Sequence, residues 1–234
     1  MNTNEPQYIC GLKKCDFQTT INGKKTDLYI LKNKSGNEVA ITNYGGAIQA
    51  IMIPDKNGNY ANVIQGHDNI NSVINSPEPY LSTLIGRYGN RISKGKFQLN
   101  GKEYQLPINN GPNSLHGGIN GFNKKVWDAL MMNNETLILN YVSSYGEEGY
   151  TGEVKVTVEY TFNDNNELII EYMATTNKKT IINLTSHGYF SLTGISDPTP
   201  TVDSLLCEIN ADFYLPIDDT CIPTGEIRFV KDTP

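Results

Sequence analysis

Residues 152–162 read GEVKVTVEYTF, and apolar and polar side chains alternate along the whole stretch. The apolar side chains, from Val154 to Phe162, fall on one face, and charged or hydroxyl side chains fall on the other. Because successive side chains of a strand point to opposite faces, this pattern predicts a β-strand with one buried face. The turn sequence NDNN follows at residues 163–166, and ELIIEYMATT returns the chain. The segment therefore predicts an antiparallel hairpin.

The same pattern recurs elsewhere in the chain. Residues 95–107, GKFQLNGKEYQLP, carry Asn-Gly at their centre, which is typical of a type I′ hairpin turn. Residues 47–66, AIQAIMIPDKNGNYANVIQG, place a polar turn between two apolar runs. The helical signal is limited to a short segment before Pro77, and 21 glycines and 11 prolines interrupt the chain too often for long helices. We therefore expect one all-β domain over residues 1–234, built as an antiparallel sandwich or barrel.

Composition and charge exclude several classes of function. The net charge is −6, so neither nucleic acid nor an anionic membrane is an expected partner. The sequence contains no apolar stretch of about 20 residues that would span a bilayer. The four cysteines form no CxxC pair and the three histidines lie far apart, so no zinc site is expected. Reduced thiols and a polar N-terminal segment indicate a cytoplasmic protein, and export stays open if a signal has been removed.

Three polar, glycine-rich segments interrupt the strand pattern, and the first is GRYGNRISKG at residues 86–95. Strand alternation would point Arg87 and Arg91 to one side, with Asn90 opposed unless a bulge forms at Gly89. For Arg87, a solvated edge or an internal ion pair is as good an interpretation as a ligand role. The amide of Asn90 and the guanidinium of Arg91 supply several donors in fixed planes, which suits the binding of hydroxyl oxygens.

The other two segments each contain a histidine followed by glycine. His116 lies in NNGPNSLHGGINGFNKKVWD and His187 in NLTSHGYFSL. Taken alone, His187 is better explained as a satisfied core histidine. Two His–Gly units among three histidines nevertheless indicate one shared site. We expect His67 to be a surface or turn residue. We expect Trp127 to lie in the core, and a platform on which a sugar stacks is the second interpretation.

Two histidines with an arginine and an asparagine indicate proton transfer on a neutral polar substrate, because a histidine pKa lies near operating pH. The sequence lacks the G-x-S-x-G motif of a serine hydrolase. It also lacks a pair of carboxylates in these segments, as glycoside hydrolysis would need, and the glycine motifs of nucleotide binding.

The motifs GRYGNRISKGKFQLNGKEYQL, NSLHGG…GFNKKVWD and NLTSHGYFSLTG, in this order, closely resemble the aldose 1-epimerases, or galactose mutarotases. The resemblance runs from about Thr26 to the end of the chain. It implies an antiparallel β-supersandwich with an open cleft for a free hexose. It also implies interconversion of the α and β anomers of sugars such as glucose and galactose by acid and base catalysis.

The resemblance further implies roles for individual residues. His187 of NLTSHGYF would be the proton donor, and His116 of LHGG would hydrogen-bond the sugar and support the proton transfer. Asn90 and Arg91 would bind sugar hydroxyls, and Tyr189 would line the same pocket. The resemblance also implies that no cofactor and no metal are needed.

One family motif is not found in this sequence. The resemblance implies a glutamate general base in a motif near the C-terminus, and the 234 residues contain no match to it. We therefore expect a C-terminally incomplete epimerase that lacks the C-terminal strands and has little activity alone. The alternatives are a carbohydrate-binding protein without catalysis and an epimerase of hexose 6-phosphates, and the acidic balance weighs against the latter. We expect a monomer or weak dimer, and the preferred hexose stays open.

Overall fold

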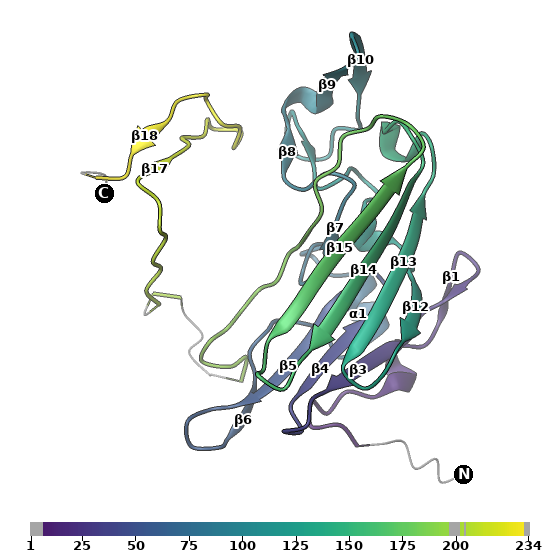
Figure 1. Ribbon diagram of the computed structural model, residues 1–234, viewed down its shortest axis with the longest axis vertical. Coiled ribbons are helices and arrows are strands. Elements are labelled where there is room, and N and C mark those ends of the chain that lie inside the picture. Colours follow the sequence, from purple (N-terminus) through teal and green to yellow (C-terminus); the bar gives the residue numbers. More distant parts are fainter. Residues whose placement is uncertain (1–6, 197–201, 204, 232–234) are drawn as a thin grey trace.

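Two four-stranded antiparallel sheets form the centre of the computed structural model, which describes residues 7–196, 202–203 and 205–231 (Figure 1). The first sheet has the order β3 (Leu28–Lys32), β4 (Glu38–Thr42), β5 (Ile48–Pro54), β6 (Tyr60–Asn62). The second has the order β12 (Asp128–Met131), β13 (Thr136–Ser143), β14 (Val154–Phe162), β15 (Leu168–Thr176). Each sheet is a meander of strands that follow one another in sequence. The predicted all-β fold is confirmed.

The hairpins predicted from the sequence are all present. In the β14–β15 hairpin, Phe162 pairs with Leu168 across the NDNN turn. Strands β5 and β6 pair across the predicted polar turn. The third hairpin joins β9 (Lys96–Leu99) to β10 (Lys102–Gln105), and its two turn residues both have positive φ, 54° at Asn100 and 76° at Gly101. A type I′ turn requires this backbone conformation, which explains the Asn-Gly sequence.

The main hydrophobic core lies between the two sheets. The apolar face of β14, including Val158 and Tyr160, packs there against residues of β4 and β5 such as Ile41 and Ile48. Trp127 is 1% exposed and belongs to this core, as predicted. Complete burial of each such side chain is worth about 1.5–3 kcal/mol, so this layer holds the two sheets together.

The first sheet is also covered on its outer face, and this explains why its strands lack the alternation of β14. A second core there includes Phe17 of η1 (Lys14–Phe17) and Val73 of α1 (Ile70–Ile74). All five residues of β4 are consequently buried. Helix α1 is the predicted short helix before Pro77, and the Asn69 side chain caps it by accepting the Ser72 N–H.

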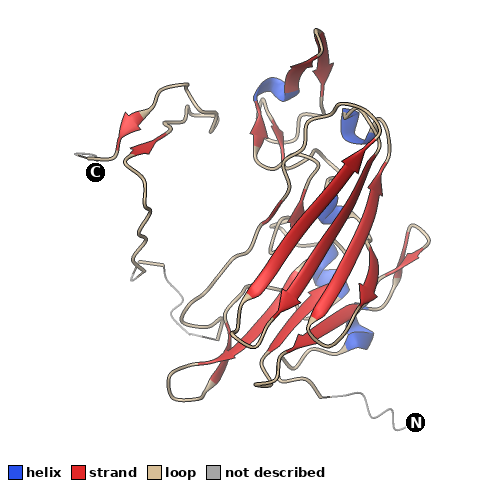
Figure 2. Cartoon of the chain, viewed as in Figure 1, coloured by secondary structure: helices blue, strands red, loops and turns tan. Residues whose placement is uncertain are grey.

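The remaining elements are short, as the colouring of Figure 2 shows. The 3₁₀ helices are η2 (Ser93–Gly95), η3 (Phe122–Lys124) and η4 (Glu147–Gly149). Four two-stranded pairs join β1 (Thr20–Ile21) to β2 (Lys24–Lys25), β7 (Leu84–Ile85) to β16 (Thr185–Ser186), β8 (Arg91–Ile92) to β11 (Ser114–Leu115), and β17 (Phe213–Tyr214) to β18 (Arg228–Phe229). The β17–β18 segment lies apart from the two sheets in Figure 1. No helix among the described residues is long and apolar enough to cross a membrane.

Candidate functional site

The β8–β11 pair brings Asn90 opposite His116. Leu115 pairs with Arg91 in antiparallel register, so His116, after Leu115, meets Asn90, before Arg91. The Asn90 N–H donates to Nδ1 of the His116 ring at 3.0 Å, and the His116 N–H donates to the Asn90 carbonyl at 3.1 Å. Both residues have positive φ, 63° and 51°, so the chain leaves the strand conformation here. The simple alternation expected between Arg87 and Arg91 is therefore broken at Asn90.

His187 follows β16 and is fixed by its backbone to the two residues that precede β7. Its N–H donates to the Thr83 carbonyl at 2.9 Å, and its carbonyl accepts from the Ser82 N–H at 3.0 Å. Its ring meets the ring of His116 edge to face, with centroids 5.1 Å apart. The two His–Gly units, 71 residues apart in the chain, thus form one pair of rings.

Two tyrosines extend this pair. Tyr189 stacks on His187 with ring centroids 5.1 Å apart, and Tyr80 stacks on the same imidazole at 6.2 Å. Tyr80 also meets His116 edge to face at 4.6 Å. The sequence arguments named Tyr189 but not Tyr80, whose segment was considered only for its short helix. The sequence signal that could have identified Tyr80 is its position, directly after Pro77 and Pro79 and shortly before the apolar residues of β7.

Glu78 places a carboxylate beside both tyrosines. Its Oε1 accepts the Tyr80 N–H at 3.1 Å, and its side chain accepts the Tyr189 hydroxyl. Burial raises the pKa of Tyr80 and of Tyr189, and the charge of Glu78 raises both further. Both phenols are therefore neutral donors at physiological pH.

Arg91 is half-buried and held by two asparagine side chains. Its Nε donates to Oδ1 of Asn110 at 2.9 Å, and one terminal nitrogen donates to Oδ1 of Asn90 at 3.3 Å. A guanidinium carries five N–H donors, so these two contacts leave donors for a bound molecule. Arg91 also lies close enough to His116 to affect its ionisation. The pKa of His116 falls to about 4, through burial first and then through the charges of His187 and Arg91.

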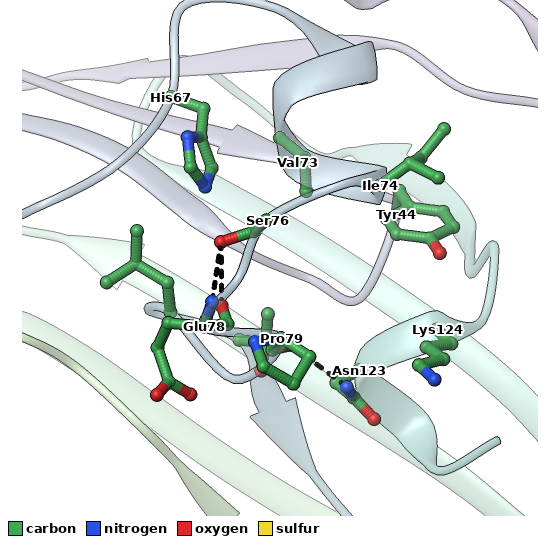
Figure 3. Close-up of a pocket in the computed structure, with 11 residues that line it drawn as sticks. Tyr44, His67, Val73, Ile74, Ser76, Glu78, Pro79, Asn123 and Lys124 are labelled. Atoms are coloured by element: carbon green, nitrogen blue, oxygen red, sulfur yellow. Dashed lines mark hydrogen bonds between the residues drawn. The ribbon is translucent and has the colours of Figure 1, made fainter. Parts of the chain in front are cut away.

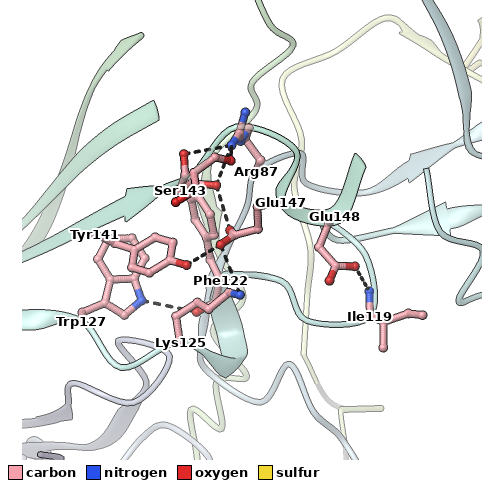
Figure 4. A network of polar contacts seen from close by, with 10 residues as sticks. Arg87, Ile119, Phe122, Lys125, Trp127, Tyr141, Ser143, Glu147 and Glu148 are labelled. Atoms are coloured by element: carbon pink, nitrogen blue, oxygen red, sulfur yellow. Dashed lines mark hydrogen bonds and ion pairs between the residues drawn. The ribbon is translucent and has the colours of Figure 1, made fainter. Parts of the chain in front are cut away.

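Arg87 lies away from this group, in a buried network (Figure 4). It is 2% exposed, and its two terminal nitrogens donate to the carbonyls of residues 143, 144, 151 and 152 and to the Ser143 hydroxyl. Ser143 in turn donates to Glu147, which also accepts from Tyr141 and pairs with Lys125 at 3.4 Å. Arg87 is thus an internal residue rather than an exposed ligand group, but its partners are carbonyl and hydroxyl oxygens, and the expected ion pair is not found among the described residues.

The loop that carries His116 packs closely on the Gly86–Arg87 backbone. Gly117 has φ 89°, and a Cβ built on it would lie 1.9 Å from the Gly86 carbonyl oxygen. No other residue fits without moving the backbone, which is the physical reason for the glycine after His116. The Phe122 N–H donates to the same carbonyl at 3.0 Å, so the two segments are joined on both sides of the turn.

His67 was expected on the surface or in a turn, and this expectation is wrong in part. Its ring lines a pocket with Tyr44, Ser76, Glu78 and Asn123 that contains neither His116 nor His187 (Figure 3). The Nε2 atom is buried and makes no hydrogen bond within the described part of the chain. Burial lowers the pKa of His67, and the charge of Asp68 opposes the shift.

The sequence matches the profile of the aldose 1-epimerase family over residues 27–234. The chain belongs to the aldose 1-epimerase family. Galactose mutarotase of Bos taurus is 44% identical over 195 residues, which are 83% of this chain and 56% of that protein. Aldose 1-epimerase of Haemophilus influenzae is 34% identical over 221 residues, which are 92% of this chain and 63% of that protein.

Solved structures of relatives share the fold of this epimerase-family chain. A GalM/aldose epimerase homologue from C. elegans superposes with a TM-score of 0.79 at 31% identity, over 89% of this chain and 62% of that one. Galactose 1-epimerase from Lactobacillus acidophilus gives 0.77 at 26% identity, over 92% and 62%. The predicted galactose mutarotase-like β-supersandwich is thus confirmed. The chain spans less than two thirds of the length of each of these four relatives.

Proposed function

We propose that this chain carries the sugar-binding side and the acid of an aldose 1-epimerase site, acting on free hexoses such as glucose and galactose. The observation that carries the proposal is the pairing of His116 and His187, whose ring centroids are 5.1 Å apart. Asn90, Arg91 and Tyr189, the other residues expected at the site, contact one or other member of this pair or each other. The names of the relatives support the same activity.

In the proposed reaction, His187 donates its proton to the ring oxygen of the sugar. The bond from that oxygen to C1 breaks while a base removes the proton of the C1 hydroxyl, which leaves an open-chain aldehyde. Rotation about C1–C2 and closure by the reverse steps give the other anomer. A positioned acid of this kind contributes about 10²–10⁴-fold to the rate.

The same proposal covers partners and location. A free hexose is neutral, and hydroxyl groups are recognised by donors such as the Arg91 guanidinium rather than by charge steering. We propose no nucleic-acid or membrane partner, a monomer or weak dimer, and a cytoplasmic location in keeping with the cysteine pattern.

Two measurements on one preparation test the proposal. Polarimetry of fresh α-D-glucose or α-D-galactose measures mutarotation, and NMR titration with galactose measures binding. Residues 1–234 should bind galactose and catalyse weakly, because the glutamate base implied by the family resemblance has no match among them. Near-full catalysis by these residues would contradict the missing-base expectation, and absence of galactose binding would contradict the proposed site.

The alternatives give different results in the same experiments. A carbohydrate-binding protein would bind galactose but show no mutarotation even in the protein expressed from its complete reading frame. An epimerase of hexose 6-phosphates would bind glucose 6-phosphate more tightly than glucose.

A further inference from the structure

His116 and His187 are both candidates for moving a proton. The ring of His116, however, has a hydrogen bond at Nδ1 that restricts where its proton can lie. Nδ1 of His116 accepts a hydrogen bond from the Asn90 N–H at 3.0 Å. A backbone amide only donates, so Nδ1 must present a lone pair to it. The proton of a neutral His116 therefore sits on Nε2.

We infer that His116 is a hydrogen-bond donor that stays neutral at physiological pH, fixed as the Nε2–H tautomer by the backbone amide of Asn90, and that Asn109 is the positioning residue that holds this arrangement. The inference rests on the proposed function in one respect only. The acceptor that Nε2–H would meet is a hydroxyl oxygen of the bound aldose. His187 is then the one member of the pair free to give up and regain a proton.

Asn109 holds the loop on both sides of His116. Its Oδ1 accepts the Leu115 N–H at 2.7 Å, and its Nδ2 donates to the carbonyls of Leu115 and Gly118, each at 3.0 Å. His116 lies between these anchors with φ 51°, a conformation that costs a non-glycine residue about 1–2 kcal/mol. The three bonds from one amide offset that cost and keep the ring against Asn90.

The two charged groups nearest the His116 ring oppose its protonation, and the other titratable groups around it do not offset them. Arg91 reaches it from β8, and His187 from the end of β16. Tyr80, on the segment after α1, is neutral, and Glu78 is bonded to its backbone rather than to His116. Glu148 lies beyond the Gly118 turn, where its Oε2 accepts the Ile119 N–H at 2.8 Å. A protonated Nδ1 would also point its hydrogen at that of Asn90. These causes agree with a His116 pKa of about 4.

Nitrogen-15 NMR of the imidazole rings tests the inference without requiring any catalysis. The chain has three histidines, so His67→Gln and His187→Gln assign all three ring patterns by elimination. At pH 7 the His116 ring should show an unprotonated Nδ1 and a protonated Nε2, and it should titrate near pH 4. An Nδ1–H tautomer, or titration near 6.5, would overturn the inference.

Two neighbouring asparagines provide a matched pair of variants. Asn109→Ala, and Asn109→Leu, which keeps a similar volume without the three hydrogen bonds, should give mixed tautomers and move the His116 midpoint up towards 6.5, the ordinary value. Asn110→Ala removes the partner of Arg91 Nε and should leave the His116 tautomer unchanged. Identical His116 spectra in the wild type and both Asn109 variants would overturn the role of Asn109. Failure of galactose to bind while the tautomer is as stated would count against the proposed function alone, so the two ideas fail separately.

Discussion

Arg87 and Arg91 lie four residues apart in one segment, and the structure uses them in opposite ways. Arg87 is 2% exposed and donates to four main-chain carbonyls and two hydroxyls. Arg91 is half-buried and makes two side-chain hydrogen bonds, to Asn110 and Asn90. The Arg87 network joins β13 to the loop before β14, whereas Arg91 lies beside the histidine pair.

The difference shows how to separate a structural cation from a candidate binding cation. A buried guanidinium must find most of its hydrogen-bond partners within the protein, because an unpaired buried charge is very costly. The two terminal nitrogens of Arg87 do so, and its Nε has no partner among the described residues. Burial lowers the pKa of Arg87, and the charge of Glu147 opposes this. A guanidinium at a binding site instead keeps donors available. Loss of Arg87 should therefore affect stability, and loss of groups near Arg91 should affect binding and catalysis.

The largest expected effect is on catalysis, through His187. His187→Ala should lower mutarotation about 10²–10⁴-fold, because the proposed proton donor is removed. Galactose binding should persist in part through Arg91 and Asn90. Polarimetry on the protein expressed from its complete reading frame, paired with NMR titration, measures both.

His67→Ala is the matched control, since the pocket that this histidine lines includes Glu78 but neither His116 nor His187. It should leave the mutarotation rate within about twofold of the wild type. Unchanged catalysis in His187→Ala would remove its proposed role as the acid.

Replacement of Arg87 should have the next largest effect. Arg87→Met leaves several buried acceptors without a donor and removes a charge near Glu147, which should lower the free energy of unfolding by about 3–5 kcal/mol. Urea unfolding followed by circular dichroism measures the change. Arg91→Met, four residues away and half-buried, should cost less than about 1 kcal/mol. Equal losses in the two variants would contradict the separation of their roles.

Much of the fold followed from local patterns in the sequence. Strict alternation predicted β14, and Asn100-Gly101 predicted the β9–β10 turn, because both depend on backbone geometry within a few residues. Burial of both faces of the first sheet depends on η1 and α1 packing against it, which no local period records.

The candidate site was predicted less completely. His116 and His187 were paired through their shared His–Gly units, and the rings do lie together. Tyr80 and Asn109 were not identified, because their contacts depend on how the loops fold back onto β8 and β11. The assignment of Arg87 also needed the structure, since only there do residues 143–152 surround it.

A smaller effect concerns the pH dependence of stability through His116. Its pKa is about 4 in the folded protein and 6.5 for an ordinary histidine, so the unfolded chain takes up the proton first as pH falls. This contribution to stability is complete above pH 6.5 and is lost as pH falls through about 4. Water reaches the half-buried ring, so the loss should be roughly 1–2 kcal/mol. His116→Gln, which has no such group, should show a shallower decline in urea unfolding between pH 7 and 4.5, and parallel curves would contradict the shift.

The smallest expected effect is that of Arg91→Lys. An ammonium keeps the charge but lacks the planar fork, so the Nε bond to Asn110 and at least one donor to the sugar are lost. One hydrogen bond is worth about 0.5–1.5 kcal/mol, so the dissociation constant for galactose should rise about 2- to 12-fold, with little change in urea unfolding. Lys96→Arg on β9, which can keep its exposed pair with Glu103, is the control and should change neither quantity. If Arg91→Lys lowered stability and left galactose affinity unchanged, Arg91 would be a structural cation like Arg87, because a residue that keeps donors for a ligand must lose affinity first.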